Sequence, residues 1–422
     1  MRRNHQINVF KLKTRACRAL ALAVLAVLPP AAAAAEAAAE QTAGNAASAG
    51  AGNCPFGRTL KVAVYQPGTY IDFQKVFLQT ALALSADGYL NAGSVLEPDF
   101  AFDAGDNYRK LALETKGGCF EFLPDGFYNG RWHGNDVDDK AAELKERVKS
   151  AGDVDLIWAL GTVGGLQFAD STLGVPVMVM TPSDPESAGI IGPGEFSDKP
   201  NIHVQKEINR TKNELTMFHR IFKFKNLGII IDDDPENWAG QSLPALEETS
   251  KELGVSLVRC TGPVIDTDVK KAQQAYSKCI VELADKCDAV YLSLGNGASP
   301  DDLFSQIKPL IDRQIPTFSQ AGGSEVQAGA LLSLSDMDLR ESGAFEARVA
   351  EAIYQGRKPE QISQYYYAPL NLNLNLETAR LIDWKPDFEL LMAIDQVYQT
   401  IKRPQQKLEV VAAGGAAPQN SD

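Results

Sequence analysis

Metal-binding and catalytic motifs are missing from this chain of 422 residues. It contains no nucleophile elbow G-x-S-x-G, no Walker A loop and no H-E-x-x-H sequence. Only four histidines occur, and the three that follow residue 35 (His133, His203 and His219) do not have the spacing of a metal site. No C-x-x-C pair suggests zinc either. The sequence therefore predicts no metal, no cofactor and no enzymatic activity.

Basic residues are scarce relative to acidic ones. The chain has 41 Lys and Arg against 54 Asp and Glu, and six of the basic residues lie within residues 1–35. The remainder carries 35 basic and 54 acidic side chains, a net charge of −19. Such a surface repels nucleic acid and anionic lipid, and no basic stripe compensates for it. We therefore expect no nucleic-acid partner.

Long hydrophobic runs are absent except near the N-terminus. Six basic residues precede the apolar run Ala19–Leu28, which is followed by PPAAAAAEA. A basic region, a short apolar region and small residues form the pattern of a secretory signal peptide, to which we assign residues 1–35. The run is too short to span a bilayer comfortably, although an uncleaved membrane anchor remains the alternative. The sequence thus predicts export to the periplasm.

An odd number of cysteines remains once the predicted signal peptide is removed. Cys17 leaves with the signal peptide, and five cysteines remain. An oxidising compartment permits disulfides among them, but at least one stays unpaired. Cys54 precedes the first apolar run and Cys119 opens the second, so we hypothesise that these two pair. The pairing of Cys260, Cys279 and Cys287 stays open.

The central part of the chain alternates short apolar runs with amphipathic helical patterns. The runs fall into two sets of four: 60–65, 119–123, 154–160 and 175–180, then 226–231, 255–260, 288–294 and 315–319. Continuous apolarity is typical of strands covered on both faces, as in parallel sheets. Helical patterns between them indicate two α/β lobes.

The segments outside these sets are more polar. Residues 36–58 are largely Ala, Gly and Ser and read as a flexible spacer, and residues 403–422 read as a disordered tail. The Pro- and Gly-containing segment 185–205 separates the two sets and is a candidate crossover. Leu370–Leu376 alternates Leu with Asn, which predicts an edge or connecting strand with one wet face. Residues 91–117 form a long insert without a clear place.

Candidate binding residues lie in the turns that follow the strands, because ligands of open parallel sheets sit at the carboxyl ends of the strands. The hydroxyl of Thr162 and the amides behind it suit a carboxylate, or Thr162 caps its own helix. Ser183 and Asp184 stand before Pro185, where an ordinary Asx turn is the alternative. Asn296 lies between two glycines, and a positive φ explains it equally well.

The order of these turns resembles that of a known family. The turns follow one another in the segments DLIWALGTVGGLQFA, VPVMVMTPSDPESAGII, KNLGIIIDDDPENW, DAVYLSLGN and IPTFSQAGGSEVQAGALLSLSDMDLRESGAFEA. This succession is similar to that of ABC-transporter substrate-binding proteins of the tryptophan/tyrosine type. The resemblance runs from about Leu60 to Tyr398. It implies a type 1 periplasmic-binding fold: two Rossmann-like α/β lobes with parallel sheets, joined by three crossover segments, with the ligand in the cleft. Lobe 1 would comprise 59–187 plus about 335–362, and lobe 2 would comprise 188–334 plus about 373–402.

The resemblance also implies a set of ligand-binding residues. The turn after the first strand would form one wall of the cleft, and Gly161 and Thr162 would hold the polar end of the ligand. The second lobe would close over the other side. The set is Gln66, Tyr70, Gly161, Thr162, Ser183, Asp184, Trp238, Asn296 and Glu325. Two departures affect the rim of the cleft: the insert 91–117 and the segment 124–136 make the first lobe longer than the family pattern. The first turn, YQPGTYIDF, also differs from the family's usual residues.

These features predict an exported solute-binding protein of an ABC importer. We expect a monomer that captures a small molecule by domain closure, with an aromatic or hydrophobic amino acid as the leading ligand, and that delivers it to a permease in the inner membrane. The acidic partner of the ligand's ammonium group would be Asp184 or Glu325. One alternative is a ligand-sensing module for a signalling partner. Another is an exported hydrolase or lyase that uses the acidic turns.

Overall fold

A computed structural model describes residues 54–91, 104–299, 301–335, 338–369 and 371–403. These residues all belong to one compact unit, residues 51–422. The predicted signal peptide, most of the predicted spacer, part of the insert and nearly all of the predicted tail lie outside the described residues. Among the helices that the structure describes, none is both long and apolar enough to cross a membrane.

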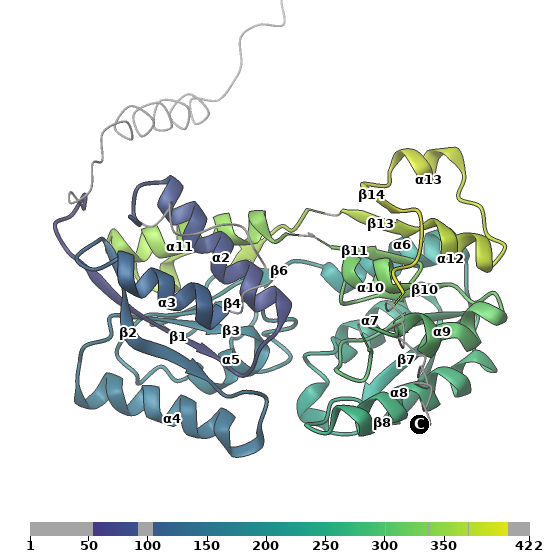
Figure 1. Cartoon of the computed structure of the whole chain (residues 1–422), viewed down its shortest axis with the longest axis horizontal. Coiled ribbons are helices and arrows are strands. Elements are labelled where there is room, and N and C mark those ends of the chain that lie inside the picture. The colour runs from purple at the N-terminus through teal and green to yellow at the C-terminus, as the bar shows by residue number, and fades with distance from the viewer. Residues whose placement is uncertain (1–53, 92–103, 300, 336–337, 370, 404–422) are drawn as a thin grey trace, which may run out of the picture. The chain divides into compact units, whose positions relative to one another are not determined.

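The first apolar set forms a five-stranded parallel sheet in the order β2-β1-β3-β4-β5. Its strands are β1 (Leu60–Gln66), β2 (Phe120–Asn129), β3 (Leu156–Leu160), β4 (Val177–Met180) and β5 (Ile202–Val204). Both faces are covered, which explains the continuous apolar runs. One face carries α2 (Ile71–Ala86), α3 (Ala104–Glu114) and α11 (Arg340–Tyr354), and the other carries α4 (Gly134–Ser150) and α5 (Gly161–Phe168) (Figure 1).

The second set forms a seven-stranded sheet in the order β14-β13-β11-β10-β9-β7-β8. Its strands are β7 (Asn226–Asp232), β8 (Ser256–Gly262), β9 (Ala289–Leu292), β10 (Thr317–Ser319), β11 (Leu332–Leu334), β13 (Leu372–Asn375) and β14 (Gln396–Tyr398). Only β13 runs antiparallel to a neighbour, β11. The accompanying helices are α6 (Arg210–Phe222), α7 (Leu243–Leu253), α8 (Val269–Ala284), α9 (Leu303–Asp312), α10 (Gly323–Ala328), α12 (Leu376–Leu381) and α13 (Phe388–Met392).

The chain passes between the two sheets three times. After β5 it leaves through β6 (Lys206–Glu207), and after β11 it returns to α11, which packs on α2. It leaves again through β12 (Tyr365–Tyr366), which pairs in parallel with β6. The predicted α/β fold with two largely parallel sheets and three crossovers is therefore confirmed.

Two details of the sequence interpretation differ from the structure. Residues 202–204 were expected in the second lobe, but they form β5 and pair with β4 of the first sheet. The Leu/Asn segment was expected to form an edge or connecting strand with one wet face. Instead β13 lies between β11 and β14, and all four of its residues are buried.

The buried asparagines of β13 form hydrogen bonds with the protein in place of water, although the Asn373 Oδ1 has no partner among the described residues. The Asn375 side chain accepts the backbone N–H groups of Glu377 and Thr378 and donates to the Val326 carbonyl at 2.8 Å. The Asn373 amide donates to the carbonyl of Asn371 and the hydroxyl of Ser335. Period two indicated the strand correctly, but the polarity of one face reflected internal hydrogen bonds rather than solvent.

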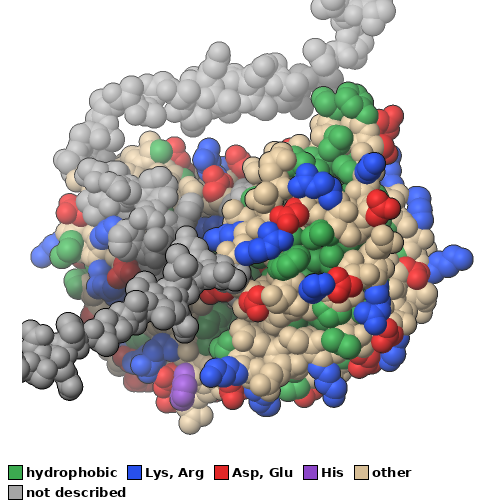
Figure 2. Space-filling model, turned by 45° about the vertical axis from the view of Figure 1, so that its right-hand side comes forward, with side chains coloured by type: hydrophobic (Ala, Val, Ile, Leu, Met, Phe, Trp, Pro, Cys, Tyr) green, Lys and Arg blue, Asp and Glu red, His purple; other side chains and the backbone are tan. Residues whose placement is uncertain are grey.

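Two disulfides tie down elements at sheet edges. The hypothesised Cys54–Cys119 bond is present and joins the segment before β1 to the start of β2. A second bond, Cys260–Cys279, joins β8 to α8, and Cys287 is a buried free thiol whose pKa burial raises to about 11. On the face seen in Figure 2, acidic and basic side chains are interspersed.

Candidate functional site

A cavity of about 200 Å³ lies where turns associated with the two sheets and the crossovers meet. Its walls come from the start of α2, the turns after β4, β9 and β10, the strands β6 and β12, and the start of α11. The lining residues are Tyr70, Asp72, Phe73, Lys75, Thr181, Pro182, Ser183, Gln205, Glu207, Arg210, Leu294, Gln320, Ala321, Gly323, Ser324, Gln327, Ser335, Leu339, Ser342, Tyr366, Ala368 and Tyr398. This is the carboxyl-end location at which α/β sheets bind ligands.

Arg210 is the best-anchored charge in the cavity wall. As the first residue of α6, it donates from Nε to Glu214 at 3.1 Å and from one terminal nitrogen to Glu207 at 3.3 Å. Its other terminal nitrogen donates to the Gln320 carbonyl at 2.9 Å. Burial opposes the charge, but Glu207 and Glu214 outweigh it and raise the pKa of the Arg210 guanidinium. A permanent cation therefore stands in the wall, and its orientation is fixed on three sides.

The partner beneath Arg210 is a buried carboxyl. The side chain of Glu214 is 1% exposed, and the Tyr291 hydroxyl donates to it at 2.5 Å. Burial raises the pKa of Glu214 to about 7, and the nearby Arg210 limits the rise. Arg210 therefore connects the cavity with the core of the second sheet, where Tyr291 stacks on Phe318.

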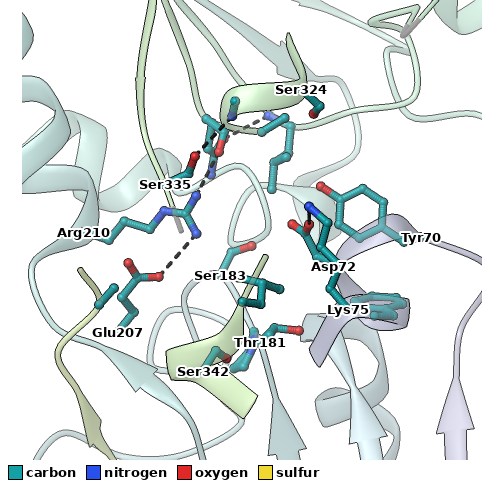
Figure 3. A pocket seen from close by; sticks show the side chains of 18 of the residues that line it. Tyr70, Asp72, Lys75, Thr181, Ser183, Glu207, Arg210, Ser324, Ser335 and Ser342 are labelled. Atoms are coloured by element: carbon teal, nitrogen blue, oxygen red, sulfur yellow. Dashed lines mark hydrogen bonds and ion pairs between the residues drawn. The ribbon is translucent and has the colours of Figure 1, made fainter. Parts of the chain in front are cut away.

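Asp72 and Lys75 carry charge on the first turn of α2. Their charged groups are 3.8 Å apart, one helical turn from each other. Burial raises the pKa of Asp72, while Lys75 and Arg210 act in the opposite direction. In the view of Figure 3, Asp72, Lys75 and Tyr70 lie on one side of the cavity, and Arg210 and Glu207 lie on the other. The site thus offers both signs of charge to a ligand.

Aromatic residues also line the cavity. Tyr70 precedes α2 in extended conformation, and its ring meets that of Phe73 edge-on at 5.3 Å between centroids. Burial, with a contribution from Asp72, raises the pKa of Tyr70 well above its ordinary value, so its hydroxyl stays neutral. Tyr366 and Tyr398 also line the cavity.

The turn after β4 is held by a buried polar bridge. The side-chain Oε1 of Gln205 accepts the Thr181 backbone N–H at 2.9 Å, and its Nε2 donates to the Ser342 hydroxyl at 2.7 Å. Thr181 has a φ of 53°, which is rare for a β-branched residue, and among the described residues its hydroxyl has no partner. Strain of this kind gathers at binding sites, where surrounding contacts maintain it.

The structure places two of the nine expected site residues in the cavity wall: Tyr70 and Ser183. Gly161 and Thr162 lie behind it. Gly161 has a φ of 74° and leaves no room for a Cβ beneath the Phe73 ring, and the Thr162 hydroxyl accepts the Ser183 N–H at 3.0 Å. Thr162 therefore positions the turn that carries Ser183.

The remaining five do not line the cavity. Asp184 accepts the Ser187 N–H in a local turn, and Asn296 exchanges hydrogen bonds with the Asp266 backbone. The Trp238 indole donates to the Asp232 carbonyl. Glu325 accepts from the Ser319 hydroxyl at 2.7 Å, and Gln66 is fully buried at the end of β1.

Sequence reasoning missed the charged residues of the wall. Asp72 belongs to the first turn, YQPGTYIDF, whose departure from the family pattern was noted, so a signal existed. Arg210 had none, because its partner Gln320 lies 110 positions away. Among the residues that the structure describes, no cluster of His, Cys, Asp or Glu could hold a metal ion.

Comparison with known proteins gives structural neighbours but no sequence relatives. No family model matches the chain. No curated protein matches it either.

Three solved structures are similar over 81% of this chain and 100% of their own length. An ABC domain from Streptococcus pneumonia in complex with L-Trp has a TM-score of 0.60 at 14% identity. A conserved domain protein from Vibrio cholerae has a TM-score of 0.59 at 18% identity. The ligand-free, open form of a substrate-binding protein with adhesive properties from Clostridium difficile has a TM-score of 0.55 at 17% identity.

These similarities confirm, at the level of fold, the resemblance inferred from the order of the turns. The chain has the type 1 periplasmic-binding fold that ABC-transporter substrate-binding proteins share.

Proposed function

We propose that this protein is an exported solute-binding protein of an ABC importer, which holds a small molecule and delivers it to a membrane permease. The observation that carries the proposal is the cavity itself. Turns and helix starts associated with two separate sheets converge on it, together with both crossover strands, β6 and β12. A ligand seated there contacts both halves of the molecule at once.

The chemistry of the wall supports a zwitterionic ligand with an aromatic or apolar side chain. Arg210 suits a carboxylate, since a guanidinium with fixed orientation binds planar anions well. Asp72 suits an ammonium group, and Tyr70 and Phe73 offer ring faces to an apolar side chain. The neighbour from Streptococcus pneumonia was solved with L-Trp. An aromatic or hydrophobic amino acid therefore remains the leading ligand, with Arg210 and Asp72 in the roles first given to Thr162 and to Asp184 or Glu325.

The proposed function depends on how much more the ligand stabilises one conformation of the protein than the other. A ligand that touches both halves stabilises a closed state over an open one, and only contacts unavailable in the open state shift the population. The crossovers, including the β6–β12 pair, connect the halves and are where such a motion would hinge.

A calorimetric titration tests the proposal. The exported form, unfolded and refolded to remove carried-over ligand, is titrated with amino acids, sugars, purines and small carboxylates. We expect saturable one-to-one binding to a monomer by an aromatic or branched amino acid. Binding confined to sugars or purines would contradict the ligand class, and no binding by any compound would contradict the function.

One observation favours a second candidate, an exported hydrolase or lyase. The carboxyl groups of Asp72 and Glu207 both line the cavity, from different elements. Glu207, however, is engaged by Arg210. Mass spectrometry of the ligand after prolonged incubation separates the candidates: the binding protein returns it unchanged, and an enzyme returns a product.

A further inference from the structure

The segment between β2 and α4 belongs to the part of the chain that departs from the family pattern. The register of β1 and β2 shifts between the pairs Val62–Phe122 and Val64–Phe127. Over this stretch β1 contributes two residues and β2 contributes five, so β2 bulges. The extended β2 ends at Asn129, and Gly130–His133 then reach the turn that follows β1. That turn leads directly into Tyr70 and the cavity wall.

Three hydrogen bonds join the two turns. The Gly130 N–H donates to the Gln66 carbonyl at 3.0 Å, and the Trp132 N–H donates to the Pro67 carbonyl at 2.8 Å. The Trp132 indole Nε1 donates to the Thr69 carbonyl at 3.0 Å. Three carbonyls between Gln66 and Thr69 thus accept hydrogen bonds from the Gly130–Trp132 turn, and the last of them precedes Tyr70.

The indole also fills the space above the turn. A Cβ on Gly68 would overlap the Trp132 ring, so glycine is required there by close approach rather than by backbone conformation. The ring lies 6.2 Å from that of Phe73, which in turn meets Tyr70 at 5.3 Å. Arg131 and Trp132 both adopt left-handed conformations, with φ of 55° and 53°. Two consecutive strained residues are maintained only where other contacts enforce them.

We propose that Trp132 is a positioning residue of the ligand site: it braces the Pro67–Tyr70 turn and, through Phe73, fixes the aromatic wall against which the ligand packs. The indole does not line the cavity. Its effect on the ligand passes through Phe73 and the Thr69 carbonyl. The part of the inference that concerns ligand affinity rests on the proposed function.

The test compares Trp132→Ala and Trp132→Phe with the control Trp384→Ala. Trp384 is a half-buried indole of the second sheet's periphery, 4.8 Å from the ring of Phe222, and it does not line the cavity. Hydrogen exchange of the amides in residues 68–74 and of Gly130 is measured without ligand. The dissociation constant of L-phenylalanine is measured on the same samples.

We expect Trp132→Ala to speed exchange in these amides about tenfold and to weaken L-phenylalanine binding at least tenfold. Trp132→Phe keeps a ring but loses the Nε1 donor, and it should recover part of both effects. Gly68→Ala, which displaces the indole from the other side, should shift both in the same direction. Trp384→Ala should change neither the exchange rates nor the dissociation constant, even if it lowers the melting temperature as much as Trp132→Ala does.

The two readouts separate failure of this inference from failure of the proposed function. Unchanged exchange in residues 68–74 for Trp132→Ala would overturn the brace. Faster exchange with an unchanged dissociation constant would overturn the role of Trp132 in ligand affinity. If the wild-type protein does not bind L-phenylalanine, the proposed ligand fails, and the exchange measurement alone decides whether Trp132 holds the turn.

Discussion

Arg210 joins three parts of the molecule through one side chain. It holds Glu207 of the crossover strand β6, Glu214 of its own helix and the Gln320 carbonyl after β10. Gln320 in turn accepts the Leu294 N–H after β9 and donates to the Ser242 hydroxyl before α7. The orientation of the cation in the cavity is therefore set by the core of the second sheet.

Removing this cation should affect binding and stability together. Arg210→Met leaves Glu214 buried without its charge partner, so we expect the free energy of unfolding to fall by about 3 kcal/mol. Amino-acid binding should weaken at least a hundredfold, since a carboxylate would lose about 3 kcal/mol of charge-assisted hydrogen bonding. Urea unfolding and calorimetric titration measure the two effects. Arg220→Met, on the exposed side of the same helix, should change neither; equal losses in both variants would contradict the assigned role.

Glu325 predicts a dependence of stability on pH. Burial raises its pKa to about 7, against a smaller opposing effect of the Ser319 hydrogen bond. A carboxyl whose pKa is raised on folding stabilises the fold while it is protonated. That stability is fully present below about pH 4.5 and is lost as the pH rises through about 7.

The matched variant Glu325→Gln isolates this contribution from other titrating groups. Between pH 5 and pH 8 the free energy of unfolding of the wild type should fall by about 2 kcal/mol more than that of the variant. Urea denaturation at a series of pH values measures the difference. Parallel pH profiles would show that Glu325 does not titrate in this range.

At the scale of elements, the crossing of α2 and α11 positions the two parts of the cavity wall that the starts of these helices form. Gly343 of α11 faces Gln79 and Thr80 of α2 so closely that a Cβ would overlap the Gln79 side chain and lie 2.8 Å from the Thr80 backbone nitrogen. Both helices begin at the cavity, α2 after Tyr70 and α11 near Ser342. A change in their spacing would therefore alter both walls.

Gly343→Ala tests this packing, because helix propensity and packing predict opposite signs. Alanine should favour the helix by about 1 kcal/mol, but overpacking a close crossing costs about 1–3 kcal/mol. The obstacle includes backbone, which cannot rotate away, so we expect net destabilisation of about 1 kcal/mol or more by urea unfolding. Arg348→Ala, on the exposed face of α11, should stay within about 0.5 kcal/mol of the wild type. A more stable Gly343→Ala variant would mean that the crossing is looser than the structure shows.

Element boundaries also show where pattern reasoning is sound and where it fails. Continuous apolar runs correctly indicated strands such as β3 and β9, which are covered on both faces, because both-face burial leaves a mark in each strand's own residues; the edge strand β8 is an exception and is largely uncovered. The alternation in β13 correctly indicated a strand but not its surroundings. Asn373 and Asn375 are polar because they meet buried carbonyls and amides, and a sequence does not distinguish these partners from water.

At the scale of the whole molecule, ligand binding should compact the protein. At a ligand concentration of one hundred times Kd, linkage adds about 2.7 kcal/mol to the stability of the bound state. If this free energy favours a closed conformation, the radius of gyration from small-angle X-ray scattering should fall on adding the amino acid that binds in the titration. Arg210→Met, at the same ligand concentration, should show at most half of this decrease, because a hundredfold weaker affinity leaves at most half of the sites occupied. A thermal shift without compaction would indicate that the cavity binds its ligand without closure.

The sequence by itself determined eight strands of the two sheets and their largely parallel arrangement, because both depend on local periodicity. It also placed Tyr70 and Ser183 in turns that follow β1 and β4, and the structure finds both residues in the wall of the candidate cavity. Only the tertiary structure decided which other side chains share the cavity. Arg210, Gln205 and Ser342 meet there because segments more than a hundred residues apart cross at one point. Such meetings depend on packing between elements, which no single stretch of sequence records.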